Sequence, residues 1–476
     1  MLTKHRRKTI TYNKMSNNFQ KVLGTKDVLM VAFGAMIGWG WVVSSGQWIQ
    51  TGGALGTALG FFIGGVMIYF VGLTYAELTT AMPKNGGAQN FSLEAFGSLG
   101  SFICSWTLVL SYIGVICFEA CSFATIMQYV VPDFLQGYLY TIAGYDVYLS
   151  WVATSVLSSM LIVYINCLGI KKAVVFQNLL TVIIAGVGMF LVAGSSYSGE
   201  IQNLSHQAFV GNNLWEQISN VLKVAIMTPF FLFGFDIIPQ AAEEINVPLR
   251  RLGRLMISAI ALAVFFYAMI AIAIGYVMSP MQIESSMSST GMVTADAIAV
   301  AFSNEAMTKV LIIGGLCGIV TTWNSFLLGG SRIIFSMSKA KMLPESFSKL
   351  HSTSQTPYIA ILFLGVLSMV SPFFGRVMLI WIVDAANFAC CIAYCIVALS
   401  FLRLRKIKPE LSRPFKVSNG RIVGVVATFM SGIMILLYLI PSTNCSLIWQ
   451  EWIIISVWVL IGVLMAIRAA KLNKDL

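Results

Sequence analysis

Two short stretches of the sequence place helix-breaking residues inside apolar runs. Residues 34–40 contain three glycines, and residues 228–236 contain a proline, a glycine and an aspartate. Proline lacks a backbone donor and glycine disfavours the helix, so each stretch is expected to interrupt a helix. At such a break, unpaired N–H groups attract a carboxylate, and unpaired carbonyl oxygens accept hydrogen bonds from an ammonium group. A zwitterion between two breaks would satisfy both without any charged side chain.

The residues expected to contact such a ligand are those of the two breaks and the phenylalanines beside the second. They are Ala35, Met36, Ile37, Gly38, Trp39, Gly40, Phe230, Phe231, Phe233, Gly234 and Phe235. Close helix packing is the alternative for the first break, because Gly34 and Gly38 also form a GxxxG pair. The phenylalanines would by default face the core or the lipid. Beside broken backbone, at least one of them is expected to cap a binding pocket.

Three acidic residues lie within apolar runs: Glu119, Asp236 and Asp384. A charge at the middle of a bilayer costs about 2.5–3.5 kcal/mol even on lenient scales. Each carboxyl could be a proton site, a partner for a cationic substrate, or an acceptor for backbone donors that a break frees. Asp236 directly follows the second break, which favours the structural role. Glu119 is the first candidate for a proton or amine contact.

Hydroxyl and amide side chains gather in the apolar run 307–338. Thr322 and Ser325 supply oxygens of the kind that a sodium ion or a polar substrate binds. The alternative is that these hydroxyl groups bond back to their own helix, as buried Ser and Thr commonly do. Both residues therefore remain candidates for an ion or substrate site.

These stretches belong to a chain of 476 residues that is 58% hydrophobic and only 10% charged. Soluble domains carry about 25% charged residues, so the composition excludes a soluble enzyme, a disordered chain and a nucleic-acid-binding protein. A bilayer-crossing helix needs about 20 apolar residues, and continuous apolar runs favour helices over a β-barrel. The sequence therefore predicts an all-α integral membrane protein with twelve transmembrane helices, near 27–50, 54–81, 98–131, 149–168, 173–195, 221–242, 255–278, 307–338, 357–374, 377–402, 422–440 and 451–467. A row of glycines at four-residue spacing begins just before the second run and continues within it. We interpret this row as a packing face, formed by Gly52, Gly56, Gly60 and Gly64.

The distribution of Lys and Arg predicts the orientation. If the N-terminus is cytoplasmic, 27 of the 30 basic residues lie inside, and only Lys223, Lys309 and Arg376 lie outside. The positive-inside rule then places both termini in the cytoplasm. It also explains the net charge of +11 without a nucleic-acid partner. At the cytoplasmic ends, solvated or ion-paired gate roles are expected for Glu77, Glu243 and Glu244.

The two breaks fall on the first members of two successive groups of five spans. Because five is odd, the first and sixth spans run in opposite directions. Interrupted helices at matching positions of two inverted halves indicate the substrate site of an alternating-access transporter.

Four stretches together resemble the amino acid–polyamine–organocation (APC) transporters, and the likeness extends over nearly the whole chain. They are Met36-Ile37-Gly38-Trp39-Gly40; Tyr75-Ala76-Glu77-Leu78 with Pro83, Gly86 and Gly87; Phe233-Gly234-Phe235-Asp236 with Glu243, Glu244 and Pro248; and Gly329-Gly330-Ser331-Arg332 with Met342-Leu343-Pro344. The resemblance implies an amino acid permease with a LeuT-like fold, in which two inverted five-helix repeats precede two further helices. The divisions it implies are a cytoplasmic segment 1–26, repeats 27–195 and 221–402, an extracellular loop 196–220, a cytoplasmic loop 403–421, two helices within 422–467 and a cytoplasmic tail 468–476.

The resemblance also implies roles for the two breaks. The backbone around Gly38 and Gly40 would bind the substrate carboxylate. The second break, with its aromatic residues, would contact the amine and the side chain of the substrate. Two departures from the family pattern stand out. Trp39 occupies a position that is usually small, and the run 173–195 lacks the lysine that some relatives carry. Proton coupling through such a lysine is therefore unsupported.

The expected function is secondary active transport of an amino acid across the cell membrane, by symport or antiport. Ethanolamine, a polyamine or another amine is the alternative substrate, and an amino acid exchanger is the alternative mode. A membrane-embedded enzyme is a distant alternative, since the acidic pair Glu243-Glu244 has no histidine near it. No metal or cofactor is expected beyond a coupling proton or sodium ion. The expected partners are a small-molecule substrate and the lipid bilayer.

Overall fold

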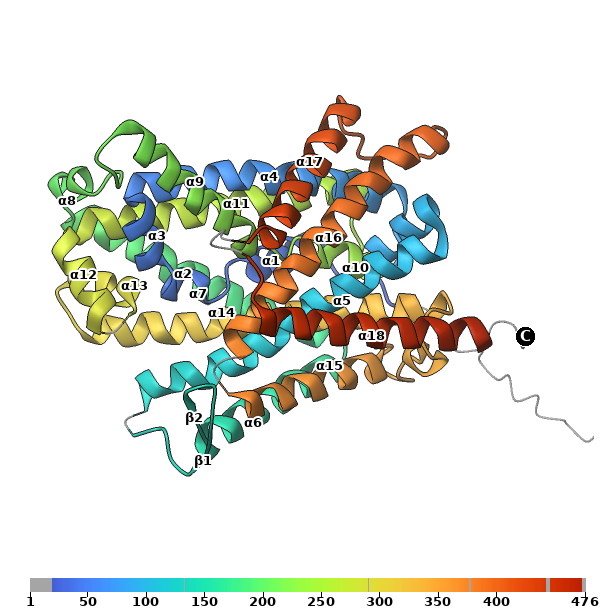
Figure 1. Ribbon diagram of the computed structural model, residues 1–476, viewed down its shortest axis with the longest axis horizontal. Helices are drawn as coiled ribbons and strands as arrows, with labels where there is room; N and C mark the ends of the chain where they lie inside the picture. The colour runs from blue at the N-terminus through green and yellow to red at the C-terminus, as the bar shows by residue number, and fades with distance from the viewer. Residues whose placement is uncertain (1–18, 132, 290, 376–377, 442–445, 473–476) are drawn as a thin grey trace, which may run out of the picture.

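The computed structural model describes residues 19–131, 133–289, 291–375, 378–441 and 446–472. In these ranges the chain is a bundle of helices with one short β-hairpin (Figure 1). Arg376, most of the predicted segment 1–26 and the end of the predicted tail lie outside the described residues.

The predicted repeat 27–195 is helical apart from the hairpin and the connections. Its elements are α1 (Thr25–Met36), α2 (Gly40–Val43), α3 (Ser45–Gly52), α4 (Ala54–Ala81), α5 (Ala88–Val130), β1 (Tyr138–Ile142), β2 (Tyr145–Tyr148), α6 (Leu149–Cys167) and α7 (Ile170–Ser198). Helix α5 begins earlier than the predicted span at 98, because residues before Gly97 form a further helical segment. Gly97 joins the two segments with a φ of 73°, which glycine adopts readily.

The remainder of the chain continues the bundle. Its elements are α8 (Ile201–His206), α9 (Leu214–Phe231), α10 (Ile237–Gln240), η1 (Ala242–Glu244), α11 (Leu249–Val277), α12 (Pro280–Ser289), α13 (Val293–Phe302), α14 (Ala306–Lys339), η2 (Glu345–Ser348), α15 (Tyr358–Val370), η3 (Ser371–Phe374), α16 (Met378–Ile407), α17 (Gly420–Leu439) and α18 (Trp449–Leu472). The prediction of an all-helical membrane protein is confirmed.

Ten helical stretches among the described residues are long and apolar enough to cross a membrane. Two of the twelve predicted spans are shorter in the structure. The run 357–374 forms the apolar stretch Tyr358–Phe374, and the run 221–242 is divided by its break. The count of twelve crossings therefore stays a prediction, because length alone does not establish it for these two.

Both predicted helix breaks are present. Helix α1 ends at Met36 and α2 begins at Gly40, while α9 ends at Phe231 and α10 begins at Ile237. Gly234 lies in the second break with a φ of 128°. A Cβ atom at this position would lie 2.7 Å from the Cβ of Ala35. Glycine is needed here for the backbone conformation and for the contact between the two breaks.

The predicted glycine stripe is a packing face, and the structure shows that its partner is α9. A Cβ atom on Gly60 would lie 2.8 Å from Val224, and one on Gly64 would lie 2.6 Å from the carbonyl oxygen of Ala225. Small residues allow such close helix packing inside a membrane. The stripe therefore fixes the position of α9 and, through it, the second break.

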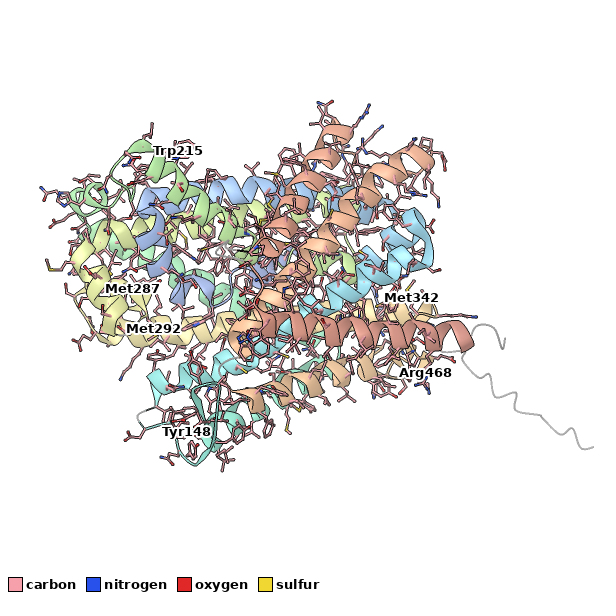
Figure 2. The ribbon with its side chains drawn as sticks, viewed as in Figure 1. Tyr148, Trp215, Met287, Met292, Met342 and Arg468 are labelled. Atoms are coloured by element: carbon pink, nitrogen blue, oxygen red, sulfur yellow. The ribbon has the colours of Figure 1, made fainter. Side chains whose placement is uncertain are left out.

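The two ends of the bundle differ in structure. Helices α8, α12 and α13 and the hairpin lie at the left end in Figure 1, and the C-terminal end of α18 lies at the right. Figure 2 shows Met287 and Met292 at the first end and Met342 and Arg468 at the other. The first end is the one that the charge distribution predicts to be extracellular.

Candidate functional site

A cavity with a volume of about 90 Å³ lies where the two helix breaks meet. One water molecule needs about 10–15 Å³ of such space, so the cavity has room for several waters or a small ligand. Eight predicted binding residues line it: Ala35, Met36, Gly38, Trp39, Gly40, Phe230, Phe231 and Phe233. Two predicted polar candidates, Glu119 and Thr322, also line it.

Three of the predicted binding residues lie beside the cavity without lining it. Ile37 is fully buried, and Gly234 packs against the backbone of Ala35. Phe235 packs edge-on against Tyr75, with the ring centroids 5.5 Å apart. These residues therefore hold the two breaks together, and they contribute no surface to the cavity.

The first break leaves backbone donors free. Among the described residues, the N–H groups of Gly38 and Trp39 donate to no backbone or side-chain acceptor. Gly38 and Trp39 both line the cavity. Free N–H groups of this kind attract an anionic group such as a carboxylate.

The carbonyl groups at the end of α1 are bonded to neighbouring helices. Tyr267 on α11 donates to the carbonyl oxygen of Met36 at 2.7 Å. Thr321 and Thr322 on α14 donate to the carbonyl oxygens of Gly34 and Ala35 at 3.1 and 3.4 Å. These hydroxyl groups hold the end of α1 in place, and Thr321 also bonds back to Gly318 on its own helix.

Glu119 is the acidic residue of the cavity lining. It lies in α5, its side chain is only 3% exposed, and its Oε2 atom has no hydrogen-bond partner. Its Oε1 atom lies 3.6 Å from the position that a Cβ atom on Gly38 would occupy. No described Lys or Arg residue lines the cavity. A buried acceptor without a partner, beside the free donors of the first break, can bind an ammonium group or a proton.

Asp236 lies outside the cavity and is held by three donors. Tyr112 and Tyr394 donate to its carboxylate at 2.6 and 3.0 Å, and the N–H of Gly234 donates at 3.1 Å. These contacts connect the second break to α5 and α16. The arrangement is that of a structural acceptor, which the sequence favoured for this residue.

Two further predicted candidates lie away from this cavity. The hydroxyl group of Ser325 is buried and has no hydrogen-bond partner, and it does not line the cavity. Asp384 lines a second cavity, which adjoins the first.

Sequence comparison identifies the family to which this architecture belongs. Residues 23–464 match the sequence model of the family described as amino acid permease. The chain belongs to the amino acid permease family. Family members are transporters, so this permease is a membrane transporter and not an enzyme.

Several curated relatives align with the permease over most of its length. The methylthioribose transporter of Bacillus subtilis is 22% identical over 96% of this chain and 95% of its own length. The branched-chain amino acid permease BcaP of the same organism is 25% identical, with the same coverage. The human Asc-type amino acid transporter 1 is 25% identical over 84% of this chain and 74% of its own length.

One end of the permease carries polar contacts between η1, which follows the second break and α10, and its neighbours. The guanidinium of Arg332 on α14 bonds to Glu244, with 2.8 Å between Nε and Oε1. Asn85 and Glu243 exchange two hydrogen bonds of 2.8 and 3.3 Å. Burial raises the pKa of the Glu244 carboxyl, and the neighbouring Arg332 guanidinium opposes that rise. The ion-paired role predicted for these acids is consistent with the contact of Glu244, whereas Glu243 forms hydrogen bonds with Asn85 and no ion pair within the described residues.

Several lining residues were missed by the sequence analysis. Tyr267, Phe118, Phe326, Ser44 and Asn387 line the cavity of the permease. Asn387 carried a signal, because it is an amide in an apolar run. The aromatic residues carried none, since helices of any membrane protein contain such side chains.

Proposed function

We propose that this permease is a secondary active transporter that moves an amino acid across the cell membrane by alternating access. The observation that supports this proposal is the cavity between the two breaks. Its lining contains Gly38 and Trp39, whose N–H groups are free, and Glu119, whose Oε2 atom has no hydrogen-bond partner. Donors beside an acceptor complement the carboxylate and ammonium groups of one amino acid.

The lining of the cavity supports a neutral amino acid with an apolar side chain as substrate. Its walls include Val43, Val115, Phe118, Phe230 and Phe326. Glu119 is the one charged residue of the lining within the described part of the chain, and it would repel a second carboxylate on the substrate. An amine without a carboxylate is the alternative, since it would use Glu119 and leave the N–H groups of the first break unpaired.

The orientation of the chain in the membrane is inferred from the distribution of its Lys and Arg residues. With 27 of 30 Lys and Arg residues on one side, both termini are cytoplasmic. The ion pair of Arg332 with Glu244 then closes the cytoplasmic side of the cavity. Opening toward the cytoplasm requires this pair to separate, and movement of α1, α10 and their neighbours against the other helices would do so.

We assign to Glu119 the coupling of substrate transport to proton binding. Its carboxyl is the acidic group that, among the described residues, lines the substrate cavity beside the first break. Binding of a proton there changes the charge that the substrate ammonium meets, and this links transport to pH.

The experiment is uptake into proteoliposomes of each of the twenty proteinogenic amino acids, with and without sodium and at two pH values. Saturable uptake of an apolar amino acid that rises at acidic external pH and is independent of sodium is the expected result. Absence of uptake and of exchange for every amino acid would contradict the proposal.

A further inference from the structure

A second cavity, with a volume of about 240 Å³, adjoins the central one. It is bounded by α3, α9, α16 and α17, on the side that the charge distribution predicts to be extracellular. Phe230, Phe231, Phe233 and Asn387 line both cavities. Ser44 and Val383 also line both cavities, so the two spaces share one wall.

Asp384 is the charged residue in the lining of the second cavity. Its carboxyl lies close to that of Glu451 on α18, a residue that is 2% exposed. No basic side chain lines this cavity, and neither acid takes part in an ion pair within the described residues. Two carboxyl groups in contact repel each other when both are ionised, so they need a proton or another cation between or beside them.

The walls of the cavity carry the second, independent indication of a cationic ligand. Trp48, Phe230, Phe231, Phe233 and Tyr438 all line it. Aromatic faces attract ammonium groups through their quadrupoles, and a water-poor site strengthens this attraction. A lone proton or a sodium ion would make no use of such walls. The combination of a carboxylate with several aromatic rings fits an organic ammonium ion.

We propose that the second cavity is a binding site for an organic ammonium group, held by Asp384 and enclosed by the aromatic side chains. Asn387 connects this site to the central cavity, because its amide lines both spaces. The identity of the natural ligand rests on the proposed function. The ligand is the amino group of a substrate molecule that binds on the extracellular side of Phe230, Phe231 and Phe233 before it enters the central cavity.

The test uses isopentylammonium chloride, which has no carboxylate and so cannot use the N–H groups of the first break. Binding to the purified full-length permease is measured by isothermal titration calorimetry at fixed pH. Asp384→Asn is expected to weaken binding by about tenfold or more, because the charge is lost while the shape is kept. Glu284→Gln, which changes an exposed acid on α12, is expected to leave this binding step in place.

A second variant protects the test against misfolding. In Glu451→Gln the amide can donate to Asp384, so the carboxylate no longer needs a cation, and weaker binding of isopentylammonium is expected. This variant decides the matter if Asp384→Asn does not elute as the wild type does in size-exclusion chromatography. The proposal would be overturned if the wild type did not bind isopentylammonium, or if the folded variants bound it with wild-type affinity. In either case the two carboxyl groups would be interpreted as sharing a proton.

The proposed transport function and the proposed second binding site can be contradicted independently of each other. A permease that binds isopentylammonium through Asp384 but transports no amino acid would contradict the proposed function and support the second site. A permease that transports an amino acid and binds isopentylammonium equally well without the Asp384 charge would do the reverse.

Discussion

Arg332 and Glu244 form a buried ion pair between α14 and η1, with side chains only 1% and 2% exposed. Two hydrogen bonds join them, at 2.8 Å from Nε and 3.2 Å from Nη2. The pair lies at the end of the second helix break, on the side assigned to the cytoplasm. Because two charges are removed from water together, each one depends on the other for its stability.

Loss of one partner should destabilise the permease strongly. Arg332→Gln leaves the Glu244 carboxylate buried without its counter-ion, which typically costs about 3–5 kcal/mol. The expected result is a markedly lower melting temperature of the purified protein. Combining Arg332→Met with Glu244→Leu should recover most of the loss, because neither charge is then left alone. A melting temperature that is unchanged in Arg332→Gln would show that the pair does not hold this end closed.

Side chains at the first break should abolish transport without preventing membrane insertion. A Cβ atom on Gly38 would lie 2.5 Å from Oγ1 of Thr322, and one on Gly40 would lie 2.6 Å from the ring of Phe231. Valine at either position therefore fills the cavity. Uptake by Gly38→Val and Gly40→Val should fall to background while both proteins remain in the membrane fraction.

The matched control for these variants is Gly186→Val. A Cβ atom at Gly186 on α7 meets nothing within 4 Å. This variant should retain wild-type uptake. Full activity in both Gly38→Val and Gly40→Val would count against a binding site at the first break.

Glu119→Gln should flatten the pH dependence of uptake. The amide keeps the shape of the side chain and, like a protonated carboxyl, both donates and accepts hydrogen bonds, but it cannot take up a proton. Wild-type uptake is expected to rise as the external pH falls, and the variant is expected to show a nearly constant rate. An unchanged pH profile in the variant would remove Glu119 from the coupling role.

Substrate affinity should depend on Phe233 more than on Arg332. Phe233 lines both cavities, whereas Arg332 lies at the closed end and lines neither. Phe233→Leu is expected to weaken equilibrium binding by about tenfold, through lost contacts and a wider passage between the cavities. Arg332→Lys keeps the charge and should change binding by less than about threefold. Equal losses of affinity would argue against this division of roles.

The sequence predicted the two breaks because glycine and proline act locally on the backbone. Residues 37–39 and 232–236 interrupt their helices within the predicted stretches. The direction of each side chain at a break could not be predicted from the sequence, because it depends on backbone angles such as the ψ of 40° at Ile37. This is why Ile37 and Phe235 were expected in the site and lie beside it.

Contacts between distant helices could not be derived from one sequence. The bond from Tyr267 to Met36 joins residues 231 positions apart. Asp384 was recognised as an unusual charge, but its contact with Glu451 depends on how α18 packs against α16. Periodicity gives the apolar faces of helices and does not specify which faces meet.

The most direct test of the central claim is a cryo-electron microscopy structure of the permease with the amino acid that gives the highest uptake rate. The account predicts the substrate carboxylate within hydrogen-bonding distance of the Gly38 and Trp39 N–H groups, with the amino group beside Glu119. A ligand bound away from both helix breaks would contradict it, and so would helices that are continuous through residues 37–39 and 232–236.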